Sequence, residues 1–342
     1  MRFLSAVNEK EISGKTCILR VDFNVEDAKD SLRLEASLPT MRLLLKNKAK
    51  ILIISHRGRP KLVASSKQQV ARDLSLKTLV PFLKKNLGQK VKFFSDISDV
   101  SQRVGTVGLL ENLRFWPGEE SNDPDFAGQL AKLGDFYVND AFAVSHRENA
   151  SVTELPKLLP SYAGLLLEKE IETLSKAMEN PEEPLVLIMG GSKVEDKLPI
   201  IKHLLPKADR ILLGSAALNQ PELIPKSEKI ITPVDSIDGG GKAWDIGPET
   251  IKKYSEEIKK AKTIIWNGPL GQFEDEKYAK GSMEIAKAIA ASKAFSIVGG
   301  GETNQLILSL KLQNKIGFLS TGGGAMLEFL AGKKLPGIEA LK

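Results

Sequence analysis

The 342-residue chain contains one cysteine, Cys17, and only 6% aromatic residues. A single cysteine excludes a disulfide within the chain, and its position in the apolar run T-C-I-L-R-V predicts a buried thiol. The chain also lacks an apolar run long enough to span a bilayer, and residues 1–10 lack the apolar core of a signal peptide. We therefore expect a cytoplasmic protein without a membrane partner.

Two common phosphate-binding signatures are also absent. The chain has neither G-x-x-x-x-G-K-[ST] nor G-x-G-x-x-G, which excludes the P-loop and the dinucleotide fingerprint. The net charge is +6, compatible with a nucleic acid, a membrane surface or a small anionic ligand. A nucleic-acid binder is one alternative, but no basic stripe is interleaved with aromatics, so we expect no nucleic-acid partner.

What the chain does contain is a repeated unit of a short apolar run, a polar or glycine-rich tip and an amphipathic helical stretch. The expected strands are 17–21, 51–54, 91–94, 107–110, 136–138, 185–189, 211–213, 230–231, 264–266, 295–298 and 316–319. The expected helices include 38–46, 70–86, 124–133, 248–261, 277–292 and 303–312. This alternation indicates parallel α/β sheets, and the strands are too numerous for one ordinary sheet.

A domain boundary is expected between the fifth and sixth runs. Pro156 and Pro160 punctuate a connection, and residues 161–179 read as one helix that is closed by Asn180 and Pro181. The predicted fold class is α/β, with two parallel-sheet, Rossmann-like domains joined by a hinge helix. The domains are 1–155 and 181–332, with the linker and hinge helix at 156–180.

Basic side chains gather at the strand ends of the first half. In open α/β sheets, ligands bind beyond the carboxyl ends of the strands. Any one of these arginines alone would be interpreted as a solvated surface charge, but their shared position favours a small, multiply anionic ligand. The residues are Arg33, Arg57, Arg59, Arg114 and Arg147, with His56 among them.

Glycines mark the strand ends of the second half. Residues 184–201 read as a buried strand, a Gly190-Gly191 turn, Lys193 and a helix. Considered by itself, this stretch is equally compatible with a strand-turn-helix connection that carries a surface lysine and binds no ligand. Five glycine-bearing tips on one sheet edge exceed the needs of turns, and they favour backbone contacts to a nucleotide phosphate tail.

Taken together, these motifs resemble phosphoglycerate kinase. They are V-D-F-N, S-H-x-G-R-P, L-L-E-N-L-R-F, Y-V-N-D-A-F, H-R, G-G-x-K-V-x-D-K, W-N-G-P-x-G-x-F-E, G-G-G-x-T and S-T-G-G-G-A, in the order of the family from about residue 20 to 341. The resemblance implies Mg²⁺-dependent phosphoryl transfer between 1,3-bisphosphoglycerate and ADP, giving 3-phosphoglycerate and ATP. It also implies that the tail, residues 333–342, returns to the first domain, and we expect a monomer.

The resemblance implies roles for particular residues. Those for phosphoglycerate are Asp22, Asn24, Arg33, His56, Arg59, Arg114 and Arg147. Those for the nucleotide are Gly191, Lys193, Lys197, Asn267, Glu274, Gly301, Glu302, Thr303, Thr321, Gly322 and Gly323. We expect Arg33, Lys193 and Gly322 to be catalytic, and Glu302 to serve the metal.

The chain departs from the family at several positions. Glu302 stands where the family has aspartate, which moves the carboxylate by roughly 1.5 Å, one carbon–carbon bond. Asn149 replaces a histidine, and several dozen family residues are missing between Leu213 and Asp245. The shortened segment predicts reduced burial of the base and little discrimination between ADP and GDP. An impaired homologue that binds both ligands without turnover is the alternative.

Overall fold

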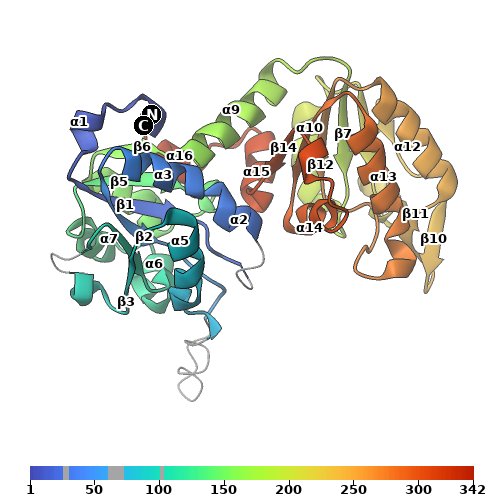
Figure 1. Cartoon of the computed structure of the whole chain (residues 1–342). Helices are drawn as coiled ribbons and strands as arrows, with labels where there is room; N and C mark the ends of the chain where they lie inside the picture. Colours follow the sequence, from blue (N-terminus) through green and yellow to red (C-terminus); the bar gives the residue numbers. More distant parts are fainter. Residues whose placement is uncertain (26–30, 61–72, 101–103) are drawn as a thin grey trace. The chain divides into compact units, whose positions relative to one another are not determined.

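The computed structural model describes residues 1–25, 31–60, 73–100 and 104–342. Within these residues, the first sheet has six strands in the order β3-β4-β2-β1-β5-β6, and every neighbouring pair is parallel (Figure 1). The strands are β1 (Thr16–Val21), β2 (Lys50–Ile54), β3 (Val91–Phe94), β4 (Val107–Leu110), β5 (Phe136–Asp140) and β6 (Ser161–Ala163). Parallel strands need crossover connections, and helices supply them here.

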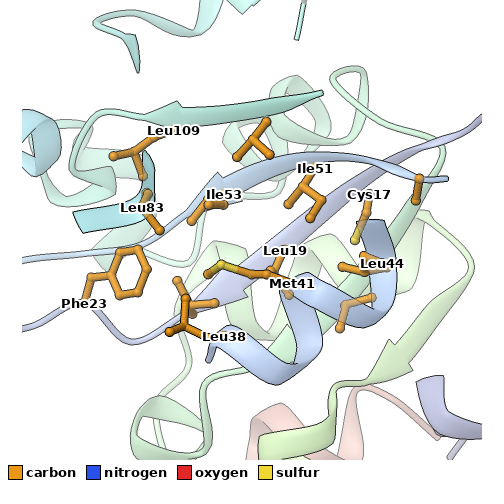
Figure 2. Packing of buried hydrophobic residues seen from close by; sticks show 14 of the residues in the cluster. Cys17, Leu19, Phe23, Leu38, Met41, Leu44, Ile51, Ile53, Leu83 and Leu109 are labelled. Carbon is orange, nitrogen blue, oxygen red and sulfur yellow. The ribbon is translucent and has the colours of Figure 1, made fainter. Parts of the chain in front are cut away.

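Helices α3 and α5 bury one face of this sheet. Figure 2 shows Leu19 of β1, Met41 of α3 and Ile53 of β2 in one apolar cluster. Cys17 is fully buried in the same cluster, as the sequence predicts, and burial raises the pKa of its thiol. The helices of this part are α1 (Glu9–Ile12), α2 (Ser31–Ala36), α3 (Leu38–Lys46), α5 (Val80–Leu87), α6 (Pro117–Glu120), α7 (Pro124–Ala131), α8 (Leu155–Leu158) and α16 (Pro336–Glu339).

The second sheet is also parallel, in the order β14-β13-β12-β7-β8-β9 within the described part of the chain (Figure 1). Its strands are β7 (Leu185–Met189), β8 (Arg210–Leu213), β9 (Ile230–Ile231), β12 (Thr263–Asn267), β13 (Phe295–Gly299) and β14 (Phe318–Ser320). Its helices are α10 (Leu198–Leu204), α11 (Ala216–Asn219), α12 (Pro248–Lys260), α13 (Lys280–Ala291), α14 (Gly301–Ser309) and α15 (Gly323–Leu330). The predicted fold class, two parallel α/β sheets, is confirmed.

The expected helix at 161–179 begins four residues later than predicted. Ser161–Ala163 forms β6, which pairs with β5 through Tyr137–Ser161 and Asn139–Ala163, and α9 (Leu165–Glu179) follows Gly164. Tyr162 is buried at this sheet edge, and a three-residue parallel strand leaves no periodicity for a sequence to reveal. The first part of the predicted linker therefore belongs to the first sheet.

The structure also corrects the predicted helix at 70–86. Residues 70–72 lie outside the described residues. Beyond them, a 3₁₀ turn (Leu76–Leu79) precedes α5, which begins at Val80 with Pro81 in its first turn. Proline is accommodated there because its missing N–H would be unpaired at a helix start in any case.

A two-stranded antiparallel hairpin, absent from the sequence prediction, projects from the second sheet's part of the chain. It consists of β10 (Ser236–Gly239) and β11 (Lys242–Ile246). Gly240 and Gly241 have φ of 60° and 79°, the left-handed backbone that a tight hairpin turn requires. The hairpin lies in the stretch where the sequence predicts the missing segment.

The chain divides into two compact units, Met1–Ile171 with Lys334–Lys342, and Glu172–Lys333. The division falls inside α9. The C-terminal tail packs within the first unit, where the Gly337 N–H donates to Ser145 O at 2.8 Å and Gly337 O accepts from Asn139 at 3.4 Å. No helix in the described ranges has the length and apolar character to cross a membrane.

Asp140 connects β5 to the start of α9. Its Oδ1 accepts hydrogen bonds from the backbone N–H groups of Leu166 and Leu167 at 2.9 and 3.3 Å, and Thr40 contributes a third. The side chain is fully buried, and burial raises its pKa to about 7 despite these bonds. Folding therefore favours the protonated carboxyl.

This raised pKa predicts a pH-dependent stability. Between about pH 4 and pH 7 the folded state holds a proton on Asp140 that the unfolded chain releases, so this contribution to stability falls as pH rises. We expect the stability of Asp140→Asn relative to the wild type to rise between about pH 4 and pH 7, measured by urea unfolding. Asp96→Asn is the control, because Asp96 is exposed and hydrogen bonds from Ser98 lower its pKa. A constant difference between wild type and Asp140→Asn would contradict this account.

Candidate active site

Five arginines converge at the carboxyl edge of the first sheet. We call them the arginine cluster: Arg20, Arg33, Arg59, Arg114 and Arg147. Burial is the largest cause that lowers the pKa of Arg114 and of Arg147, and positive charge from neighbouring arginines adds to it. The same two causes lower the pKa of the buried His56 well below its usual value, so its imidazole is neutral. Such an excess of positive charge favours a bound anion.

Arg20 is the most deeply buried arginine of this cluster. Its Nε donates to Ser151 Oγ at 2.9 Å, and its Nη2 lies 3.7 Å from Glu119 Oε1. The same Nη2 lies 3.3 Å from His56 Nδ1. With 1% of its surface exposed, Arg20 positions His56 rather than contacting a ligand.

Asp22, Asn24 and Arg33 form a connected network beside β1. Arg33 Nη1 lies 3.2 Å from Asp22 Oδ2 and donates to Asn24 O at 2.9 Å. Asn24 Oδ1 accepts from the Gly58 N–H at 2.8 Å, which links the loops that follow β1 and β2. Three predicted site residues are therefore tied together, and the Arg33 side chain remains 25% exposed.

An open cavity of about 430 Å³ lies over the outer part of the arginine cluster. Its lining includes three predicted residues, Arg59, Arg114 and Arg147. It also includes Glu120, whose Oε1 is 3.0 Å from Arg114 Nε and whose side chain is half exposed. An anionic ligand could displace this solvent-facing carboxylate from Arg114.

Four lining residues of this cavity were not among the predicted site residues: Glu120, His146, Glu148 and Asn149. His146 directly precedes Arg147 in the H-R motif, which was a usable signal. Asp22, Asn24, Arg33 and His56 do not line this cavity, although the contacts above bring them to the same edge.

Arg57 stands beside His56 in sequence but serves the backbone. Its Nε donates to Val25 O at 2.8 Å, and its Nη1 donates to Ser75 O and to Thr78 Oγ1. The side chain is 6% exposed. The Arg57 guanidinium therefore stabilises the loops of the first unit through these hydrogen bonds and does not line the open cavity.

In the second unit, the turn after β7 packs directly against the turn after β12. A side-chain carbon at Gly190 would lie 2.1 Å from Pro269 O and 2.6 Å from Gly268 O, so only glycine allows this approach. Gly191 has φ of 94° and donates its N–H to Pro269 O at 2.7 Å. The sequence G-G therefore fixes where the following Lys193 leaves the sheet, and this lysine is exposed.

Lys197 and Asn267 form the inner part of this site. Lys197 Nζ donates to Asn267 Oδ1 at 2.8 Å, and burial lowers the lysine pKa. Within the described residues, the buried Nδ2 of Asn267 has no hydrogen-bond partner, which is costly unless a ligand oxygen accepts from it. Thr303 Oγ1 accepts from the Gly268 N–H at 3.0 Å and holds the adjoining turn.

Glu302 lies in the first turn of α14, whose preceding Gly300 has φ of 105°. Burial raises the pKa of Glu302, the Glu274 carboxylate raises it further, and Lys197 opposes both. Among the described residues, no three His, Cys, Asp or Glu side chains gather as a protein-only metal site. Magnesium is commonly held by one or two carboxylates together with substrate phosphates. The Glu302 and Glu274 carboxylates fit that arrangement.

A cavity of about 610 Å³ adjoins these residues. Three of the predicted nucleotide residues line it, Gly191, Glu274 and Glu302. The others do not appear in its lining: Lys193, Lys197, Asn267, Gly301, Thr303, Thr321, Gly322 and Gly323. The lining residues that sequence reasoning did not assign are Ser192, Ser215, Ala216, Asn219, Gln220, Lys242, Ala243, Trp244, Pro269, Leu270, Gly271 and Gln272.

Gly322 and Gly323 begin α15 after β14. The Gly322 N–H donates to Ser320 Oγ at 3.1 Å, and Gly323 has φ of 35°. A helix N-terminus directs unpaired backbone N–H groups toward an anion. Parallel α/β sheets with basic side chains and glycine-rich turns at their carboxyl edges are typical of enzymes that handle phosphorylated ligands, and the two units define a protein of this class.

Comparisons with known proteins specify the class further. The family model described as phosphoglycerate kinase matches residues 7–220 and 216–333. The phosphoglycerate kinase of Thermomicrobium roseum is 38% identical over 394 residues, covering 99% of both chains. That of Leptospira biflexa is 41% identical, covering 99% of this chain and 98% of the relative. This chain therefore belongs to the phosphoglycerate kinase family, whose members are kinases of glycolysis.

Solved structures agree with this assignment. The phosphoglycerate kinase of Pyrococcus horikoshii has a TM-score of 0.85 and 32% identity, covering 100% of this chain and 98% of that one. The phosphoglycerate kinase of Coxiella burnetii has a TM-score of 0.82 and 32% identity, covering 99% and 98%.

The comparisons also support the shortening of the second unit. An alignment of 394 positions against a chain of 342 residues leaves at least 52 positions without a residue in this chain. The family model matches in two segments that overlap at residues 216–220, inside the stretch from Leu213 to Asp245 where the sequence predicts the loss. α11 and the β10–β11 hairpin occupy this region.

Proposed function

We propose that this chain catalyses reversible, Mg²⁺-dependent transfer of a phosphoryl group from 1,3-bisphosphoglycerate to ADP, giving 3-phosphoglycerate and ATP. The arginine cluster carries the proposal, because its open cavity joins Arg59, Arg114 and Arg147, and the two carboxylates in the lining, Glu120 and Glu148, are exposed. A small molecule with phosphate and carboxylate groups suits several guanidinium forks at once. The impaired homologue is the less favoured alternative, because both sets of side chains are present.

The proposed chemistry needs no strong general base. The acyl phosphate releases a carboxylate, and the ADP phosphate that accepts the group is already anionic, so positioning and charge neutralisation carry the catalysis. We assign charge neutralisation to Arg33 and Lys193, and backbone contact at the transferred group to Gly322. Asp22, Asn24 and His56 would orient the phosphoglycerate with the arginines.

The nucleotide phosphates would be held by Lys193, Lys197, Asn267 and the first turns of α14 and α15. The unpartnered Asn267 Nδ2 suits a phosphate oxygen, and Glu274 and Thr303 complete the proposed set. Bound Mg²⁺ would neutralise negative charge on the phosphates. Glu302 would hold it, directly or through a water, because its longer side chain changes the reach of the carboxylate.

A coupled assay tests the proposal. Supplied with 3-phosphoglycerate, ATP and Mg²⁺, the protein should form the acyl phosphate, which added glyceraldehyde-3-phosphate dehydrogenase reduces while it oxidises NADH. Removal of Mg²⁺ by a chelator should abolish the signal, and added Mg²⁺ should restore it. Binding of both substrates without NADH oxidation would instead support the impaired homologue.

Lys193 offers a test of the second unit's role. Lys193→Ala should lower turnover at least about tenfold while the fold is retained, because the lost interaction is charge stabilisation in the transition state. Lys202→Ala is the matched control, because Lys202 is an exposed lysine of α10. Equal turnover in wild type and Lys193→Ala would remove Lys193 from the catalytic set.

We further propose that the two units close on each other when both substrates are bound, with α9 as the hinge. Transfer between sites on separate units requires that they approach and exclude water. Solution X-ray scattering should show a smaller radius of gyration with 3-phosphoglycerate and nucleotide together than with either alone. An unchanged radius would contradict closure without contradicting either binding site.

We also propose a monomeric enzyme of the cytoplasm. Cys17, the single thiol, is buried and suits a reducing compartment. Sedimentation at micromolar concentration would test the monomer.

A further inference from the structure

The 610 Å³ cavity of the second unit has a wall with no assigned role. Besides the predicted residues, its lining includes Asn219 of α11, Gln220, and Trp244 of the β10–β11 hairpin. Asn219 and Gln220 lie where the two family-model matches meet, and the hairpin lies within the second match. The hairpin occupies a position at which base burial was expected to be reduced.

Hydrogen bonds fix this hairpin to the rest of the unit. Asn219 Oδ1 accepts from the Ala243 N–H at 2.9 Å, and Asn219 Nδ2 donates to Ala243 O at 2.9 Å. The next residue, Trp244, accepts at its backbone O from the Gln272 N–H at 2.8 Å. Asp245 is fully buried and accepts from the Gly281 N–H at 2.7 Å. Trp244 is thus anchored on both sides before any ligand arrives.

The indole ring itself is held by packing. Its centroid lies 5.3 Å from that of Tyr278, with a tilt of 37° between the rings. Within the described residues, its buried Nε1 has no hydrogen-bond partner. Trp244 is only partly buried and lines the cavity, so a rigid aromatic surface is available there.

The side-chain amides of Asn219 in α11 and of the following Gln220 already form hydrogen bonds within the protein. The Asn219 amide bonds to Ala243, and Gln220 Nε2 donates to Glu195 Oε1 at 2.9 Å. These amides are therefore poorly available to read the hydrogen-bonding edge of a base. An aromatic ring, by contrast, attracts any base through its face, and such stacking tolerates different bases.

We propose that Trp244 is the surface on which the base of the nucleotide stacks, and that the site accepts adenine and guanine diphosphates with little discrimination. This inference rests on the proposed function, which puts the nucleotide phosphates beside this cavity, where Gly191, Glu274 and Glu302 line it. It revises the expectation of weak base binding, because the hairpin supplies an aromatic wall to the cavity.

Calorimetric titration tests this inference with three ligands in the presence of Mg²⁺: ADP, GDP and inorganic tripolyphosphate, which has no base. Trp244→Ala should lower the affinity for ADP and for GDP by about tenfold to a hundredfold, the usual effect of losing one stacked base. Tripolyphosphate should bind wild type and variant equally. Trp244→Phe should keep most of the affinity, and Trp244→Leu, which has volume but no flat face, should not.

Several outcomes would overturn the inference. Equal ADP affinity in wild type and Trp244→Ala would remove Trp244 from the base site, as would equal affinities in the Phe and Leu variants if the Ala variant does not fold. An equal loss of affinity for tripolyphosphate in Trp244→Ala would show that the substitution disturbs the phosphate site and not the base site. Rejection of GDP by a hundredfold or more would show that the base is read at its edge. Failure of the wild type to bind both ADP and tripolyphosphate would refute the proposed nucleotide site itself, and the inference with it.

Discussion

Replacement of Arg33 by alanine is expected to lower kcat about a thousandfold. An arginine that neutralises a phosphoryl group in transfer commonly contributes a factor of about 10³ or more. The side chain is partly exposed and its guanidinium already lies 3.2 Å from Asp22, so it is held at the edge of the first sheet with the arginine cluster. Steady-state kinetics with saturating substrates would measure the loss.

Arg33→Lys should restore little of this activity, because an ammonium cannot reproduce two parallel N–H donors. Arg42→Lys is the matched control, since Arg42 is an exposed arginine of α3 whose Nη2 donates only to Asn86 O at 3.3 Å among the described contacts. A kcat within a few fold of wild type in Arg33→Ala would exclude Arg33 from transition-state stabilisation.

Gly190→Ala should have the largest effect on stability. The added carbon would meet backbone oxygens of Gly268 and Pro269, neither of which can rotate away, so the two turns would have to separate. Overpacking of side chains alone costs about 1–3 kcal/mol, and backbone obstruction should exceed that range. We expect the thermal midpoint of the second unit to fall by about 10 °C, measured by calorimetry.

Gly301→Ala is the control for this substitution. No atom lies within 4 Å of the position its side chain would take, so stability should be unchanged. Because Gly301 begins α14 in the proposed phosphate site, the same variant should weaken ADP binding. A wild-type midpoint for Gly190→Ala would show that the turns after β7 and β12 are not in the close contact described here.

The two sheets could be predicted because their strands are buried on both faces. Leu185–Met189 and Ile51–Ile54 therefore read as unbroken apolar runs between turn residues. β6 could not be predicted in this way, since its three residues are a strand only by virtue of pairing with β5. The paired residues Tyr137 and Ser161 are 24 residues apart in the chain. The intrinsic strand preference of residues 161–163 does not indicate this pairing.

The hairpin was missed for a different reason. Its strands carry polar residues and only moderate burial, and β10 contains a register shift between Ile237 and Asp238. The Gly240-Gly241 pair is a turn signal, but no apolar run flanks it to indicate the strands. The stretch from Pro233 to Trp244 was an alternative wall for the base, but only the structure shows that Trp244 lines the cavity.

Among the candidate site residues, those on strand tips were the most predictable. The carboxyl ends of parallel strands meet at one edge, and the structure accordingly brings Arg59, Arg114 and Arg147 to one cavity. The direction of a side chain was not predictable. Arg57 follows the same strand as Arg59, yet its guanidinium bonds to backbone oxygens of Val25 and Ser75.

The most direct test of the central claim follows the phosphorus atom. The protein is mixed with ADP, Mg²⁺ and 1,3-bisphosphoglycerate that carries a radioactive label only in its acyl phosphate. Transfer breaks the bond between that phosphorus and the acyl oxygen and forms one to a terminal oxygen of ADP, leaving the carboxylate of 3-phosphoglycerate. The account predicts the label in the γ-phosphate of ATP. Label found only in inorganic phosphate, or left in the bisphosphoglycerate, would contradict it.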